Sequence, residues 1–463
     1  MRILIKGGLI ITVDQKRRII KQGYIGIDDN RIVYVGKEKP KNFSPDITIN
    51  GKKKAVIPGL VNAHNHLSER LISGLSDSLS LYDWLQSLVW PFGKKLTGEL
   101  VYISSMLAAI EMIKSGTTCF ADMFVSLAEE NVLTHVAKAS LDVGTRCVLG
   151  RGLFESLSPF GPYDLKIADI AINDTKQILE EYKRELSDRI LSVKLCPTIT
   201  FLNSAERLRQ VRDLARKLGI GIHIHALETQ KEAKLMLEKY GKTTIEYLDD
   251  LNFLDSDVMI AHCCWISDRE IQILRERGSS VVYNPVSNMK LASGVAPIPD
   301  LLRKGVNVAL GTDGAASNDD QNMFITMRMG LYLQKVSSLN SRVLTSEDIF
   351  EMATIGGAKA VGLENQIGSI EQGKFADLVI VDLKHISMVP TNNIVKRLVL
   401  CANGSSVDTV IVNGRIVVSG GKLTTADENE IIEKAEDLSS KVLSELDVKR
   451  KLIKRGERFW EEN

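Results

Sequence analysis

The central part of the chain, residues 56–364, alternates short apolar runs with stretches of helical periodicity. Apolar runs of this length that are bounded by turn residues are typical of buried strands. Between them, segments such as residues 205–219 and 267–278 repeat apolar side chains every three or four positions, which predicts amphipathic helices. The runs predicted as strands are AVIPGLVNAHNH, which ends at His66, TTCFADM, RCVLGRG, LSVKLCPT, GIHIHALE, VMIAHCCW, SVVYNP and VNVALGTDG.

Eight strands that alternate with helices predict an α/β fold with a closed (β/α)8 TIM barrel. Such alternation implies parallel strands joined by right-handed crossovers, and eight units are the number that closes this barrel. An open doubly wound sheet is the alternative. We favour the barrel because polar residues end almost every predicted strand, and the carboxyl ends of barrel strands meet at one mouth.

The two ends of the chain show a different pattern. Residues 1–55 and 365–420 contain short apolar strands separated by Gly-Gly, Asn-Gly and Asp-Asn turns. Neither segment is long enough to close a sandwich alone, so we expect both to combine into one small composite β-sandwich domain. Residues 421–463 are charged and amphipathic, which predicts a C-terminal helical tail in the form of a solvated packing helix.

The composition adds few constraints. A chain of 463 residues with 44% hydrophobic and 25% charged residues is typical of a soluble globular protein. The net charge of +1 gives no electrostatic reason to expect nucleic acid or an acidic membrane as a partner. The six cysteines show no CxxC spacing, and the N-terminus lacks the continuous apolar core of a signal peptide or membrane span. We therefore expect a cytoplasmic protein.

Four of the seven histidines fall at the ends of predicted barrel strands. His64 and His66 lie two residues apart, so their side chains project to the same side of a strand. Such a pair alone is also compatible with two hydrogen-bonded structural histidines. His225, His262 and Asp313 end the fifth, sixth and eighth predicted strands, however, so a barrel would bring all five side chains to its mouth. This convergence predicts a metal site.

Three neutral imidazoles and one carboxylate are a ligand set for a divalent ion, zinc in the first place and ferrous iron as the alternative. The predicted metal ligands are His64, His66, His225 and Asp313. An ion held there would lower the pKa of a bound water molecule. His262 would either hold a second ion or orient the attacking water. We favour a single ion because Lys194, the residue available to bridge two ions, lies back along the fourth strand.

Glu228 follows His225 by three residues and would reach the same mouth from the next loop. It is predicted to carry a proton between the water and the leaving group, although a capping or solvated glutamate fits the same position. His223 shares a strand face with His225 but lies one step deeper, which predicts a supporting role behind the ligands.

The segments PGLVNAHNH, HALET, IAHC, NPVSNMKL and GTDGAASND resemble the amidohydrolase superfamily, in particular its branch of heteroaromatic amine deaminases and triazine hydrolases. The resemblance implies a distorted TIM barrel flanked by a composite β domain, and one metal held by the ligands named above. It implies that Glu228 shuttles protons, that His262 assists the attack, and that Asp313 is also the base that deprotonates the water. It further implies a homo-oligomer.

Within that branch, LYDWLQSLVWP, GRGLFES and MFITMRMGLYLQK are similar to deaminases of 5′-methylthioadenosine and S-adenosylhomocysteine. The resemblance implies hydrolytic deamination of an aminated purine or nucleoside-like substrate. Two positions depart from it: Gly93 stands where those deaminases carry an acid that binds the ribose hydroxyls, and Thr198 replaces a histidine. A triazine-type dechlorinase or N-dealkylating aminohydrolase is the alternative, and a barrel that has lost its catalytic function is a third.

Five residues are predicted to contact the substrate. They are Glu69, Arg70, Trp90, Arg151 and Thr198. Glu69 or Arg70 would bind a polar or charged group of the substrate, and a salt-bridged helix start is the alternative for both. Trp90 would wall the pocket unless it packs in the core. Arg151 would bind the tail of the substrate unless its role is structural.

Overall fold

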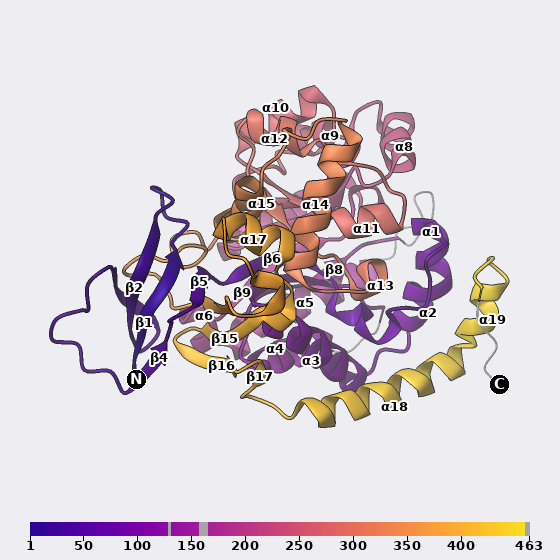
Figure 1. The fold of residues 1–463 in the computed structure, drawn as a ribbon. Helices are drawn as coiled ribbons and strands as arrows, with labels where there is room; N and C mark the ends of the chain where they lie inside the picture. The colour runs from indigo at the N-terminus through magenta and orange to yellow at the C-terminus, as the bar shows by residue number, and fades with distance from the viewer. Residues whose placement is uncertain (128–130, 157–164, 459–463) are drawn as a thin grey trace.

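A computed structural model describes residues 1–127, 131–156 and 165–458 of the chain. Its central element is a sheet of eight parallel strands that follow one another in sequence order and curve into a nearly closed barrel (Figure 1). The strands are β6 (Leu60–Asn65), β7 (Thr117–Phe124), β8 (Arg146–Leu153), β9 (Leu191–Pro197), β10 (Gly221–Ala226), β11 (Val258–His262), β12 (Ser280–Tyr283) and β13 (Val308–Leu310). The predicted (β/α)8 barrel is confirmed.

The first and last strands meet at their carboxyl ends. The Asp313 N–H, just beyond β13, donates a hydrogen bond of 3.0 Å to the His64 carbonyl oxygen in β6. The side chain of Asn62 makes two more bonds to Thr312, accepting from its N–H at 3.0 Å and donating to its hydroxyl at 2.7 Å. These bonds bring the two ends of the sheet together at the barrel mouth.

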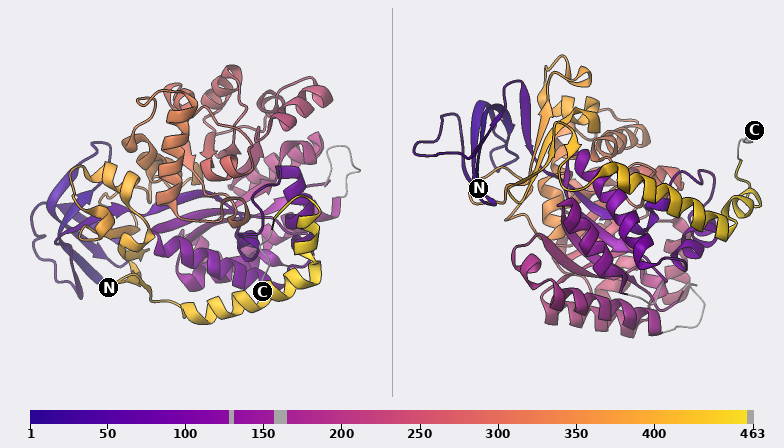
Figure 2. Two further views of the ribbon diagram at one scale, coloured as in Figure 1. Left: turned by 45° about the vertical axis from the view of Figure 1, so that its right-hand side comes forward. Right: turned by 90° about the horizontal axis from the view of Figure 1, so that it is seen from below.

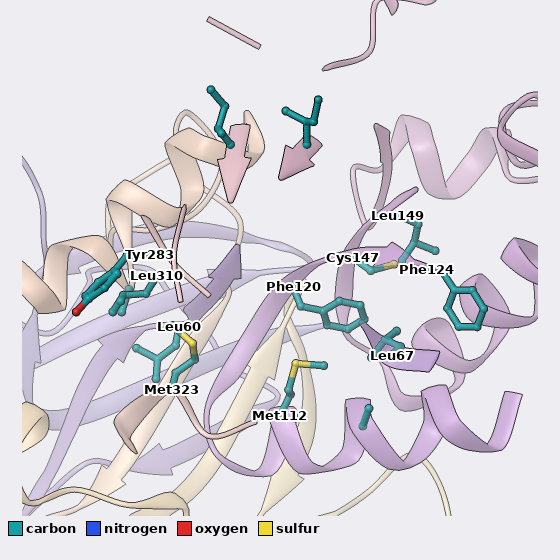
Figure 3. Packing of buried hydrophobic residues seen from close by; sticks show 14 of the residues in the cluster. Leu60, Leu67, Met112, Phe120, Phe124, Cys147, Leu149, Tyr283, Leu310 and Met323 are labelled. Atoms are coloured by element: carbon teal, nitrogen blue, oxygen red, sulfur yellow. The ribbon is translucent and has the colours of Figure 1, made fainter. Parts of the chain in front are cut away.

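Helices surround the barrel (Figures 1 and 2). The longer ones are α3 (Gly98–Lys114), α4 (Val132–Val143), α5 (Leu165–Glu181), α7 (Ala205–Leu218), α8 (Gln230–Tyr240), α10 (Asp268–Arg277) and α14 (Met323–Ser337). Shorter ones are η1 (Leu67–Ile72), α1 (Leu81–Trp84), η2 (Leu85–Val89), α2 (Trp90–Gly93), α6 (Lys183–Ser187), η3 (Thr200–Leu202), α9 (Thr244–Asp250), α11 (Pro285–Lys290), α12 (Ile298–Arg303), α13 (Ala315–Asn318), α15 (Ser346–Met352) and α16 (Ile355–Val361). Figure 3 shows Met112 of α3 and Phe120 of β7 in the apolar layer between helix and strand.

Strands from both chain ends form a separate mixed sheet of nine strands, in the order β17-β16-β15-β14-β5-β1-β2-β3 with β4 beside β1. They are β1 (Arg2–Ile11), β2 (Ile19–Asp28), β3 (Arg31–Gly36), β4 (Ile47–Asn50), β5 (Lys54–Pro58), β14 (Leu378–Asp382), β15 (Val407–Val412), β16 (Arg415–Ser419) and β17 (Lys422–Leu423). Its own apolar core is rich in isoleucine. The prediction that strands from both chain ends combine is confirmed, and they form one mixed sheet rather than the two layers of a sandwich. The segment between β14 and β15 adds η4 (Ile386–Met388), α17 (Ile394–Cys401) and η5 (Gly404–Ser406).

The prediction of a single strand that ends at His66 is wrong, because the chain is divided at Gly59 into two strands, β5 and β6. Strand β5, which includes Ile57, pairs with β1 and β14 in the mixed sheet, whereas β6 begins the barrel. A Cβ atom at Gly59 would lie 1.8 Å from the Thr118 hydroxyl oxygen, so only glycine fits this crossing point. The sequence does not reveal the break at Gly59, because the strands on either side are buried and form one continuous apolar pattern.

The C-terminal segment forms α18 (Glu428–Leu446) and α19 (Val448–Ile453), which run along the outside of the barrel (Figure 2). Apolar positions of α18 such as Ile431, Ala435 and Val442 are buried, while its other faces are charged. The predicted packing helix is therefore present. Within the described residues, no helix is long and apolar enough to cross a membrane.

A buried ion pair joins the barrel to the mixed sheet. Arg146 at the start of β8 binds Asp377 at the edge of β14 through two hydrogen bonds of 2.8 and 3.0 Å, and their side chains are 0% and 2% exposed. The guanidinium also lies 4.5 Å from the centre of the Phe375 ring. Asp377 accepts a further bond of 2.8 Å from the Asn413 N–H.

We expect the change Arg146→Met to lower the free energy of unfolding by about 3–5 kcal/mol, because it leaves the Asp377 carboxylate buried without its cation. Urea unfolding followed by circular dichroism measures this loss. Lys434→Ala, which removes the exposed ion pair with Glu430, is the control and should change stability by less than about 1 kcal/mol. Equal losses in both variants would contradict the role of the buried pair.

Candidate metal centre

Residues from four strands of the barrel converge at its carboxyl mouth. His64 lies in β6 and His66 directly after it, His225 lies in β10, His262 ends β11, and Asp313 follows β13. All five are buried. His262 and Asp313 have φ angles of 78° and 65°, a left-handed conformation that non-glycine residues seldom adopt and that turns the chain out of its strand. The structure thus brings together all the residues predicted to form the metal site.

The spacing of the facing atoms suits one metal ion. Asp313 Oδ1 lies 3.3 Å from the Nε2 atoms of both His64 and His66, and His66 Nε2 lies 3.3 Å from His225 Nε2. Ligands at about 2.0–2.1 Å from a tetrahedral zinc ion are separated from one another by about 3.3 Å. In addition, His64 Nε2 is buried without a hydrogen-bond partner among the described residues, and an ion would supply that partner. The cluster is a histidine-rich metal site.

Hydrogen bonds behind the histidines aim their Nε2 atoms at the centre. The Nδ1 atoms of His66 and His225 lie 2.6 Å from the carbonyl oxygens of Met123 and Thr198. Because a carbonyl oxygen only accepts, each Nδ1 carries the proton, and the Nε2 lone pair is left for the ion. His64 Nδ1 lies 2.8 Å from His223 Nε2, so His223 has the supporting position predicted for it.

Burial sets the protonation states that a metal site needs. It lowers the pKa of His66 to about 4 and that of His225 well below its ordinary value, so both imidazoles are neutral near pH 7. Burial alone would raise the pKa of Asp313, but His64, His262 and His66 around it hold that pKa well below its usual range. The centre therefore offers neutral nitrogens and one charged carboxylate.

Glu228 and His262 lie beside this centre. Glu228 Oε2 is 3.8 Å from His262 Nε2, and its Oε1 accepts a hydrogen bond of 3.0 Å from the Ser293 hydroxyl. Burial, followed by the charge of Asp313, raises the pKa of Glu228 to about 8, so this carboxyl group holds a proton near neutral pH. His262 Nε2 lies 3.9 Å from Asp313 Oδ2, and His262 also offers a ligand atom within 4.8 Å of those of His64 and Asp313.

Lys194 lies away from the metal centre. Its ammonium donates a hydrogen bond of 2.9 Å to the carbonyl oxygen of Asp257, which precedes β11 and so marks the amino end of the barrel. The lysine is therefore not placed to bridge two ions at the carboxyl mouth.

A cavity of about 340 Å³ opens onto the cluster. One wall is the segment from α1 to α2, in which η2 is a π-helical turn, a feature often found at functional sites. The lining is mostly apolar, and its members are His66, Glu69, Leu81, Tyr82, Trp84, Leu85, Gln86, Val89, Trp90, Val125, Phe154, Thr198, Ile199, Phe201, Leu202, His225, Glu228, Lys231, Glu232, Leu235, His262, Leu291 and Asp313. Tyr82 of α1, Gln86 of η2 and Lys231 of α8 also line the cavity, and no sequence motif marked them.

Three of the five predicted substrate contacts line the cavity, namely Glu69, Trp90 and Thr198. Glu69 Oε2 and the Thr198 hydroxyl are both buried without a hydrogen-bond partner among the described residues. Glu69 forms no ion pair with any described residue. The alternative interpretation of Glu69, a salt bridge at the start of a helix, therefore has no support among the described residues.

The structure does not bring Arg70 and Arg151 to the cavity. Arg70 pairs with Glu111 of α3 at 3.3 Å. Arg151 pairs with Asp174 of α5 at 2.6 Å, because its position in β8 directs the side chain outward to the helix layer. Both arginines thus form ion pairs with helices that surround the barrel, Arg70 with α3 and Arg151 with α5. Gly93 is buried and also lies outside the cavity lining.

A (β/α)8 barrel with a histidine-rich metal site at its carboxyl mouth defines the class of metal-dependent barrel hydrolases. Residues 55–417 match the amidohydrolase family. The chain is 39% identical to 5′-deoxyadenosine deaminase of Methanosarcina mazei, over 96% of this chain and 98% of that protein. It is 38% identical to 5-methylthioadenosine/S-adenosylhomocysteine deaminase of Thermoanaerobacter pseudethanolicus, over 94% and 98%. The chain belongs to the amidohydrolase family.

Solved structures agree with this assignment. An adenosine deaminase from Xanthomonas campestris with bound zinc superposes with a TM-score of 0.88 at 29% identity, covering 96% of this chain and 98% of that one. Atrazine chlorohydrolase from Arthrobacter aurescens, complexed with zinc, also has a TM-score of 0.88, at 24% identity over 94% and 100%. At that identity the second likeness concerns the fold alone.

We predict that His223→Ala weakens zinc binding about 10- to 100-fold, the usual cost of losing a residue that orients a metal-bound histidine. Competition with a chromophoric chelator measures the affinity. His223→Gln, which keeps an acceptor near His64 Nδ1, should lose less, and His135→Ala on α4 should match the wild type. Unchanged affinity in His223→Ala would show that the bond from His64 does not support the site.

Proposed function

We propose that this protein is a zinc-dependent aminohydrolase that replaces the amino group of an adenosine-like nucleoside by oxygen and releases ammonia. The observation that carries the proposal is the position of Glu228, a buried acid with a raised pKa that faces the cavity next to the histidine–aspartate cluster. Relatives named as deaminases of 5′-deoxyadenosine and of 5-methylthioadenosine or S-adenosylhomocysteine share 38–39% identity over nearly the whole chain, which supports it.

The zinc would be held by His64, His66, His225 and Asp313; three of the distances between their facing atoms are 3.3 Å, namely His64–Asp313, His66–Asp313 and His66–His225. When bound, it would supply Lewis acidity that makes a water molecule nucleophilic near neutral pH. Asp313 is charged and faces the same space, so it would accept the proton that the water loses.

Glu228 and His262 would serve the ring that is attacked. Protonated Glu228 would deliver its proton to the ring nitrogen, and would then take up the second proton of the attacking water and pass it to the leaving amine, which departs as ammonia. The first proton of the water, held by Asp313, would return to Glu228 and restore its protonated form. The Asn288 amide donates a hydrogen bond of 2.8 Å to His262 Nδ1, so the proton of this imidazole is on Nε2. An Nε2–H group donates rather than ligates, and His262 would therefore orient the oxygen that attacks.

The cavity supports a flat heteroaromatic substrate. Trp84, Trp90 and Phe154 place aromatic rings in its lining. Glu69 and Thr198 offer buried polar atoms without partners among the described residues, and we assign them to the polar edge of the substrate. Gly93 provides no side chain for the ribose hydroxyls, so other cavity residues would have to bind them.

An ammonia-release assay on the zinc-loaded protein tests the proposal, with 5′-deoxyadenosine, 5′-methylthioadenosine, adenine and an aminotriazine as substrates. We expect ammonia from the nucleosides, and a fall in kcat of about 10²- to 10⁴-fold for Glu228→Gln without loss of zinc. Glu238→Gln, at an exposed position of α8 outside the cavity lining, is the control and should retain activity. Release from the triazine alone, or full activity in Glu228→Gln, would refute the proposal.

A further inference from the structure

A positively charged side chain lies at the rim of the cavity. Lys231, the second residue of α8, is exposed and lines the cavity. Its ammonium lies 4.3 Å from the centre of the Tyr82 ring, which also lines the cavity. A cation held against the face of an aromatic ring has a preferred position, so the Tyr82 ring keeps the Lys231 ammonium at the rim of the cavity.

This charge is not neutralised by the described part of the chain. Lys231 forms no ion pair with any described residue, and no other lysine or arginine is among the described residues of the lining. Among the acids of the lining, Glu232 is occupied because its carboxylate accepts hydrogen bonds of 2.7 and 2.9 Å from the N–H groups of Leu227 and Glu228. Glu69, Glu228 and Asp313 lie at the metal cluster. The cavity is therefore acidic at its inner end and basic at its rim.

Tyr82 fixes the position of this cation. Its hydroxyl interacts with the side chain of Thr229, the N-cap of α8, and burial raises the pKa of Tyr82 to about 12, so the ring stays neutral. The Tyr82 ring thus connects the start of α8 to the cavity wall formed by α1 and η2.

We propose that Lys231, held by Tyr82, is a specificity-determining residue that binds the anionic end of the 5′ substituent of an adenosine derivative. The inference rests on the proposed function, because it assumes that the adenine amino group lies at the metal cluster and the 5′ carbon points to the rim. Arg151 does not compete for this role, since its guanidinium is buried against Asp174.

Two kinds of substrate carry such an anion. In S-adenosylhomocysteine the anion is the carboxylate of an amino-acid tail, and in adenosine 5′-monophosphate it is a phosphate close to the ribose. 5′-Methylthioadenosine has a neutral 5′ substituent and provides the reference. Comparing kcat/KM for these three substrates separates a requirement for charge from a requirement for one particular anion.

The experiment measures ammonia release by the zinc-loaded wild type, Lys231→Gln, Lys231→Arg and Tyr82→Leu. The quantity compared is the kcat/KM of each anionic substrate divided by that of 5′-methylthioadenosine. For at least one of the two anionic substrates, we expect this ratio to be about tenfold lower in Lys231→Gln than in the wild type. The ratio in Lys231→Arg should be close to that of the wild type, and the ratio in Tyr82→Leu should lie between those of the wild type and Lys231→Gln. Lys234→Gln removes a charge from the same helix outside the cavity lining and should keep the wild-type ratio.

Salt gives a second measurement. In the wild type the ratio should fall as ionic strength rises, because an exposed charge contact is screened, and in Lys231→Gln it should depend little on salt. Ratios in Lys231→Gln equal to those of the wild type, or equally reduced in Lys234→Gln, would overturn the inference while leaving the proposed function intact. No ammonia from any of the three substrates would instead refute the proposed function, and the inference with it.

Discussion

The hydrogen bond from the Asp313 N–H to the His64 carbonyl oxygen joins the end of the last barrel strand to the end of the first. It closes the sheet at the mouth and places two of the four proposed metal ligands side by side. His66, directly beyond β6, lies beside His64. His225 completes the group from β10, which lies across the barrel from the point where β6 and β13 meet. Without closure of the barrel at this point, the three histidines and the carboxylate would lie along an open edge, too far apart to share one ion.

The protein surrounds this group with features that fix its chemistry. Carbonyl oxygens behind His66 and His225 hold their protons on Nδ1, and burial keeps both rings neutral. The same burial raises the pKa of Glu228, so its carboxyl group keeps its proton near pH 7. One low-dielectric mouth thus provides neutral ligands, a charged base and a protonated acid at the same pH. This combination is what hydrolytic removal of an amino group requires.

Much of this site could be predicted from the sequence, because the ends of barrel strands are defined by local apolar patterns and histidine is rare in this chain. His64 and Asp313 are 249 positions apart, yet the strand count alone places both at the mouth. The break at Gly59 could not be predicted, since β5 and β6 are both buried and read as one apolar run. The separation of Arg151 from the cavity depends on which face of β8 turns inward, and a strand buried on both faces shows no alternation that would reveal it.

The central claim is that the mouth holds a single zinc ion through these four side chains. Zinc-loaded protein, dialysed against metal-free buffer and measured by atomic absorption, tests this claim most directly, with His225→Ala as the comparison. The account predicts one zinc per wild-type chain and far less in the variant. Two zinc ions per chain, none, or an equal content in His225→Ala would contradict it.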